Sequence, residues 1–107
     1  MQMTEMTNIG RIMVRVDPDL ASIVPGYIAN KKKDLLTIRE ALNRADFETA
    51  RLLGHSMKGS GGGYGFDEIS SIGRRIEAAA KSMDARGISE SLETLGEYLE
   101  RLEVEYD

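Results

Sequence analysis

The chain has 107 residues, 41% of them hydrophobic, which suits one globular domain. It has no cysteine and a single histidine, which excludes disulfide scaffolds, thiol catalysis and cysteine-ligated zinc, so no metal or other cofactor is expected. The formal net charge of −4 offers no basic surface for nucleic acid, and because there is no signal peptide or long apolar run we expect a cytoplasmic protein that does not contact the membrane.

The first stretch, residues 1–16, is rich in methionine and shows no sustained period. We interpret it as a flexible tail or linker that precedes one domain at residues 17–107. Asp17 is suited to cap a helix whose first residue is Pro18, where the missing N–H does no harm. Because Pro25 follows soon, this first helix is expected to be short.

Four longer helices are predicted from apolar residues at helical spacing. The first runs from Gly26 to about Arg44, and its three successive lysines, residues 31–33, are interpreted as a solvated face. The second is capped by Asp46 and frays in the glycines after residue 60, the third is capped by Asp67 and ends at residues 84–87, and the fourth follows directly. The expected core residues are, in order, Ile28, Leu35, Ile38, Leu42 and Ala45; Phe47, Ala50, Leu53 or Gly54, and Met57; Ile69, Ile72, Ile76, Ala79 with Ala80, and Met83; and Ile88, Leu92, Leu95, Leu99 and Leu102.

No segment shows a convincing period of two, so the predicted fold class is all-α. Short connections favour an antiparallel up-down four-helix bundle, because this arrangement buries all four apolar stripes with the least chain. The short first helix is expected as an extra element at the N-terminal end of the bundle. The protein is expected to be a monomer.

The only histidine stands in the stretch GHSMKGSGGGYGF. On a helix, Arg51, His55, Lys58 and Gly62 lie in one row away from the apolar stripe, so the imidazole is expected to point into solvent. An ammonium one turn from the ring offsets the charge of a dianionic group held on a ring nitrogen. Gly59 and Gly62 remove side-chain bulk beside the ring, which lets the active site of a second protein come close.

These residues resemble the motif of histidine-containing phosphotransfer (HPt) domains of bacterial phosphorelays, which has a histidine, two residues, Lys-Gly, a small residue and a glycine ten positions after the histidine. The matching residues are His55, Lys58, Gly59, Ser60 and Gly65. Ile69 and Glu77 also stand where the family usually has a branched residue and an acidic or amide residue. The resemblance covers about residues 17–105. Phe66 and Glu77 are similar, in addition, to the phosphoacceptor domain of chemotaxis histidine kinases.

The resemblance implies a phosphocarrier rather than an enzyme, with no ATP site of its own. In this reading His55 accepts a phosphoryl group from the aspartyl phosphate of a response-regulator receiver domain and passes it to another receiver's aspartate. Lys58 steadies the phosphoryl oxygens, Gly59 leaves room for the receiver, and Glu77 orients the imidazole through its other nitrogen. Receiver domains, and in one alternative a histidine kinase, are the partners implied.

The helical period permits the role of Glu77, because it shares a stripe with the small residues Ser70 and Gly73, and these let it lie against the preceding helix. An ordinary surface acid remains the other interpretation of Glu77. Gly62, Arg51 and Ser60 are assigned to the receiver-docking surface. For Arg51 the favoured interpretation is nevertheless a solvated charge, and for Ser60 a packing role or a local backbone bond.

Three functions stay open at this point. The first is a phosphorelay carrier labelled by phosphorylated receivers. The second is the phosphoacceptor domain of a chemotaxis-type kinase, which an ATP-binding kinase domain labels instead. The third is a non-catalytic helical interaction module, which neither donor labels.

Overall fold

A computed structural model describes residues 10–107 of the chain. Four helices make up most of this part, so the predicted helical bundle is confirmed, whereas the expectation that no segment forms a strand is wrong at both ends. The elements are β1 Ile12–Val16, the 3-10 turn η1 Pro18–Leu20, α2 Val24–Asn43, α3 Phe47–Ser60, the 3-10 turn η2 Gly62–Tyr64, α4 Asp67–Lys81, α5 Ala85–Arg101 and β2 Leu102–Tyr106.

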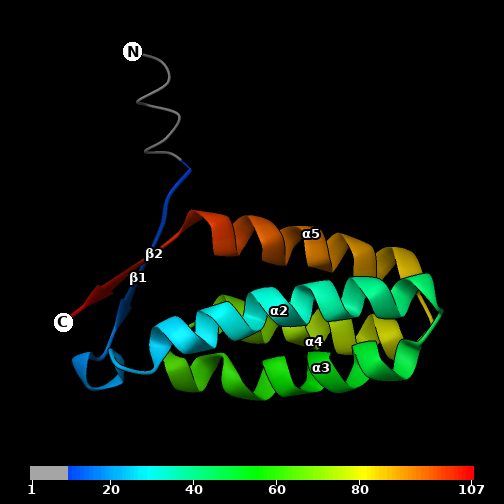
Figure 1. Cartoon of the computed structure of the whole chain (residues 1–107), viewed down its shortest axis with the longest axis horizontal. Coiled ribbons are helices and arrows are strands. Elements are labelled where there is room, and N and C mark those ends of the chain that lie inside the picture. Colours follow the sequence, from blue (N-terminus) through cyan, green and yellow to red (C-terminus); the bar gives the residue numbers. More distant parts are fainter. Residues whose placement is uncertain (1–9) are drawn as a thin grey trace, which may run out of the picture.

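The four helices lie side by side along the long axis of the molecule, and successive helices run in opposite directions (Figure 1). The same kind of turn reverses the chain after α2 and after α4. Ala45 and Met83 adopt positive φ angles of 55° and 53° there. The following residue then donates its N–H back to the helix end, from Asp46 N to Ala41 O and from Asp84 N to Ala79 O, each at 2.8 Å.

Helix starts follow from the capping residues. The predicted cap Asp46 is confirmed, because its side chain accepts a hydrogen bond from Thr49 N, and Asp84 caps α5 in the same way. The predicted cap Asp67 is wrong by one position. Phe66 is the cap of α4, and Asp67 is the first helical residue, where its negative charge still suits the helix N-terminus.

The N-terminal part of the bundle differs from the prediction in two ways. Asp17 and Pro18 do start a helical segment, but η1 is a single 3-10 turn of three residues rather than a helix. Pro25 does not interrupt the chain, because it lies in the first turn of α2, where no backbone N–H is needed for a helical bond. As a result α2 begins at Val24, two residues earlier than expected.

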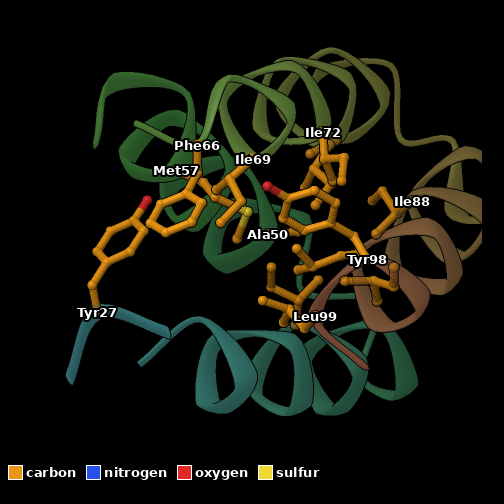
Figure 2. Packing of buried hydrophobic residues seen from close by; sticks show 14 of the residues in the cluster. Tyr27, Ala50, Met57, Phe66, Ile69, Ile72, Ile88, Tyr98 and Leu99 are labelled. Atoms are coloured by element: carbon orange, nitrogen blue, oxygen red, sulfur yellow. The ribbon is translucent and has the colours of Figure 1, made fainter. Parts of the chain in front are cut away.

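The core fills the space between the helices (Figure 2). Tyr27 of α2 lies near Phe66 and Met57 at one end, and the Tyr27 and Phe66 rings stack with centroids 6.1 Å apart. Tyr98, near the end of α5, lies at this end too, where it lines one groove with Gly65 and Asp67, whereas Ile88 lies near the start of α5. The largest fully buried side chains are Phe66, Ile38, Met57, Ile69, Ile72, Ile76, Ile88, Leu92, Leu95 and Val24.

For some residues the predicted burial or exposure is wrong. Met83 is 70% exposed rather than buried, because α4 ends at Lys81 and the turn carries Met83 away from the core. Ala45 is exposed for the same reason after α2. Lys31, expected on a solvated face, is only 3% exposed. Its ammonium lies 2.8 Å from Asp34 Oδ2 and 5.1 Å from the centroid of the Tyr27 ring, and these contacts compensate its burial.

The two ends of the described chain pair as parallel strands beside the helix ends (Figure 1). Ile12 pairs with Leu102 and Val16 with Tyr106. Leu102 therefore belongs to β2 and not to the last helix. Residues 1–9 of the predicted tail lie outside the described residues, whereas Ile12–Val16 form β1, whose Val16 side chain is buried.

Candidate functional site

His55 lies on α3 with 64% of its side chain exposed, so the outward position expected from the helical period is confirmed. The neighbouring Ala50, Gly54 and Met57 are the buried residues of the same helix. The helix thus turns these three residues into the core and places the imidazole at the surface.

Glu77 of α4 is the ring's partner. Its side chain is only 7% exposed, and its Oε2 lies 2.9 Å from His55 Nδ1. Its other oxygen, Oε1, lies 2.9 Å from Lys58 Nζ. A second ammonium, that of Lys81, is 3.8 Å from Oε2. A single, nearly buried carboxylate of α4 therefore holds two side chains of α3 together.

The charge state of Glu77 determines which ring nitrogen carries the hydrogen. The hydrogen bonds from Lys58 and then from His55 lower the pKa of Glu77 from 4.5 to about 2. At neutral pH Glu77 is therefore a carboxylate, which only accepts hydrogen bonds. His55 Nδ1 must donate, and in the neutral ring Nε2 keeps its lone pair. The result is a surface imidazole with its nucleophilic nitrogen selected by a neighbouring helix.

Close approach of α3 and α4 brings these groups together, and glycines make it possible. A Cβ added at Gly73 would lie 2.5 Å from Lys58 N, one at Gly54 2.8 Å from Glu77 N, and one at Gly61 2.5 Å from Ser70 N. Backbone atoms cannot move away from such contacts without separating the helices. The predicted stripe of small residues on α4 is thus confirmed, while the facing role of Gly54 on α3 was not predicted.

The glycine-rich segment ends α3 beside the histidine, as predicted. Gly61 caps the helix, η2 follows, and Gly65 has a φ of 95°, which a residue with a side chain adopts only with strain. Ser70 Oγ of α4 accepts a hydrogen bond of 2.8 Å from Gly62 N. The turn is therefore fixed to α4, on the same helix face as Glu77.

The residues assigned to docking divide into two groups. Gly59 faces open space, with nothing within 4 Å of an added Cβ, and Gly62 would place a Cβ in ordinary contact with Asp67 Oδ1 at 3.5 Å. Ser60 and Arg51 have partners of their own. Ser60 Oγ is 2.8 Å from Tyr27 Oη, and Arg51 Nη2 is 2.6 Å from Glu48 Oε2.

Lys81 is the residue at this site that sequence reasoning did not identify. A usable signal was present, because Lys81 follows Glu77 by four positions on one helix, the spacing at which such pairs meet. Within residues 10–107 no group of three or more metal-ligating side chains is found. No helix in the same range is long and apolar enough to cross a membrane.

Comparison with known protein families agrees with this geometry. The family model described as Hpt domain matches residues 27–105. The chain therefore belongs to the Hpt domain family, whose members act in histidine phosphotransfer in two-component signalling. Neither the curated proteins nor the solved structures gave a match.

Proposed function

We propose that this protein is a phosphorelay carrier that accepts a phosphoryl group on His55 Nε2 from the aspartyl phosphate of a receiver domain and passes it to the aspartate of another receiver. The observation that carries the proposal is the 2.9 Å hydrogen bond between His55 Nδ1 and Glu77 Oε2. It leaves Nε2 with a lone pair, on a ring exposed to a second protein.

The transfer balances with the groups at hand. The Nε2 lone pair attacks phosphorus, an N–P bond forms, and the P–O bond to the donor aspartate breaks, so that the aspartate leaves as a carboxylate. Nδ1 keeps its hydrogen throughout, and the ring gains a positive charge that the Glu77 carboxylate balances. In the forward step the acceptor aspartate attacks phosphorus, the N–P bond breaks, and the electron pair returns to Nε2.

Lys58 and the glycines support the same function. Lys58 stands one turn after His55 on α3, so its long side chain can turn from Glu77 Oε1, 2.9 Å from its Nζ, toward a phosphoryl group on the ring. Its charge then opposes the roughly two negative charges of that group. The open surface at Gly59 gives the receiver room to bring its own aspartate to the ring.

The test is transfer of radioactive label. A receiver domain that has been labelled on its aspartate is mixed with the purified protein, and we expect acid-labile, base-stable label on the wild type. His55→Gln should accept none, because glutamine keeps polarity but has no nucleophilic ring nitrogen. If His55→Gln were labelled, the assignment of His55 as the phosphorylated residue would be wrong. Labelling of the wild type only by a kinase domain with ATP would favour the phosphoacceptor-domain alternative, and no label from either donor would rule out both.

Lys58→Ala gives a graded result in the same assay. The variant loses one charge beside the phosphoryl group, an effect on the order of 1 kcal/mol at an exposed site and more once a docked receiver excludes water. We expect transfer to slow by about tenfold or more, with the fold intact. A wild-type rate together with a wild-type phosphohistidine half-life would reduce Lys58 to a solvated lysine.

A further inference from the structure

Two lysines, in addition to the imidazole, lie close to the Glu77 carboxylate. Lys58 Nζ lies 2.9 Å from Oε1, and Lys81 Nζ lies 3.8 Å from Oε2, which also accepts from His55. The two lysines differ in origin, because Lys58 is on α3 beside the ring and Lys81 is on α4, one turn after Glu77 itself.

Once His55 is phosphorylated, Lys58 cannot contact both the phosphoryl group and Glu77. A phosphoryl group on Nε2 carries about two negative charges and attracts the nearest ammonium. If Lys58 turns to the phosphoryl oxygens, Glu77 Oε1 loses its partner. The Glu77 side chain is only 7% exposed, so water compensates poorly for this loss, and an ionised carboxylate without a partner is costly at such a position.

We propose that Lys81 is a positioning residue that holds the Glu77 carboxylate, ionised and on His55 Nδ1, while Lys58 contacts the phosphoryl group. This inference rests on the proposed function. Lys81 is 61% exposed, so its long side chain has the freedom to close the remaining gap. Within residues 10–107, Glu77 is the only carboxylate within ion-pair distance of Lys81.

Lys81 is on the same helix as Glu77, so its contact with Glu77 does not depend on phosphorylation or docking at α3. The two residues are four positions apart with the acid first, which is the favourable order for an ion pair on a helix. Lys58, in contrast, shares α3 with the histidine and lies next to Gly59, where the receiver is expected to dock. One lysine thus serves the phosphoryl group and the other serves its counter-charge.

The first test needs no phosphate. Nitrogen NMR of the His55 ring at neutral pH reports the population of the neutral form with an unprotonated Nε2. Lys81→Met should keep this form, because Lys58 remains, and Lys58→Ala should keep it, because Lys81 remains. In the double variant Glu77 is left without an ammonium and should turn to solvent, so the form should fall several-fold. A double variant that matches Lys58→Ala would overturn the proposal.

The second test uses the phosphorylated protein. Lys81→Met should slow transfer from phosphohistidine to a receiver several-fold, and Lys81→Arg should restore most of the rate. Lys33→Met removes the same charge from an exposed position on α2 and should behave as wild type. Equal rates for Lys81→Met and Lys33→Met would overturn the inference but leave the proposed function standing. If the wild type takes no label at all, the proposed function fails, and the NMR test still decides whether Lys81 holds Glu77.

Discussion

The two faces of α4 do different work with residues that are next to each other in the sequence. One face carries Ile69, Ile72 and Ile76, all fully buried in the core. The other carries Ser70, Gly73 and Glu77 and lies against α3, where the backbones nearly touch. Large side chains stabilise the first face through the apolar area they bury, whereas on the second face Glu77 is the only large side chain that is buried.

The difference separates stability from geometry. Along the isoleucine face, the distance between helices is set by side-chain volume, and a changed volume is felt mainly as lost free energy. Along the glycine face, the distance is set by backbone contact. The same short distance holds for Glu77, which lies one turn further along α4. The hydrogen bond between His55 and Glu77 therefore depends on the absence of side chains at Gly54 and Gly73.

Ile72→Ala tests the isoleucine face and should have the largest effect on stability. Removing most of a fully buried side chain leaves a cavity, and we expect a loss of about 3 kcal/mol in the free energy of unfolding. The measurement is urea unfolding followed by circular dichroism. Under conditions where the variant is folded, the His55 ring signals in nitrogen NMR should match the wild type. A changed tautomer in Ile72→Ala would show that the two faces are not separable.

Gly73→Ala tests the adjacent residue on the other face. The new methyl would lie 2.5 Å from Lys58 N, so α3 and α4 must move apart, which we expect to cost about 2 kcal/mol. The distinguishing readout is the His55 ring, which should lose its preference for hydrogen on Nδ1 as Glu77 moves away.

Gly96→Ala is the matched control, because its methyl would meet only Leu35 Cδ1, at 3.5 Å. It should leave the ring signals unchanged and gain up to about 1 kcal/mol from helix propensity. If Gly73→Ala also left the ring unchanged, the close contact of α3 and α4 would not position Glu77.

Glu77→Gln addresses the charged end of the glycine face through pH. A carboxyl whose pKa is lower in the folded than in the unfolded state stabilises the fold above its unfolded pKa, and this contribution is lost as the pH falls through the folded value. For Glu77 these values are 4.5 and about 2. The urea midpoint of the wild type should therefore decline between about pH 4.5 and pH 2 more steeply than that of Glu77→Gln. Glu93→Gln, at an exposed position on α5, should retain the wild-type slope.

The sequence was informative about the site because most of it is local. His55, Lys58 and the glycines that follow lie within one helix and its end, so a motif and a period of 3.6 suffice to place them. Glu77 required a second helix, and only the spacing of small residues on α4 indicated that it could reach the ring. Lys81 was missed because a lysine four residues after a glutamate is common on any exposed helix face.

The strand pair and the buried lysine were missed for another reason. β1 and β2 are each five residues long, and they pair across almost the whole described chain, so neither segment alone signals a sheet. Leu102 also fits the apolar period of α5, which hid the end of that helix. Lys31 looked solvated within its run of lysines. Its partners Tyr27 and Asp34 are on the same helix, four positions before it and three after it, so these contacts follow from the helical period, whereas its burial depends on how α2 packs in the fold.

Gly59 differs from the glycines between α3 and α4, and its replacement should change stability only a little. It stands on α3 one turn after His55, but nothing lies within 4 Å of an added Cβ, unlike at Gly54 and Gly73. Gly59→Ala should therefore raise the free energy of unfolding by up to about 1 kcal/mol, because alanine is the better helix former. A glycine that weakens its helix without serving a contact inside the protein is expected where another protein approaches.

Gly59→Leu separates these two explanations. Leucine is also a better helix former than glycine, so the variant should unfold at the same or a higher urea concentration. Its side chain would, however, stand beside the imidazole and hold a receiver domain away, so transfer of label to His55 should slow. A small phosphate donor such as phosphoramidate, which needs no docking surface, should label both proteins at similar rates. If transfer from the receiver were unchanged in Gly59→Leu, the open surface at Gly59 would have no part in docking.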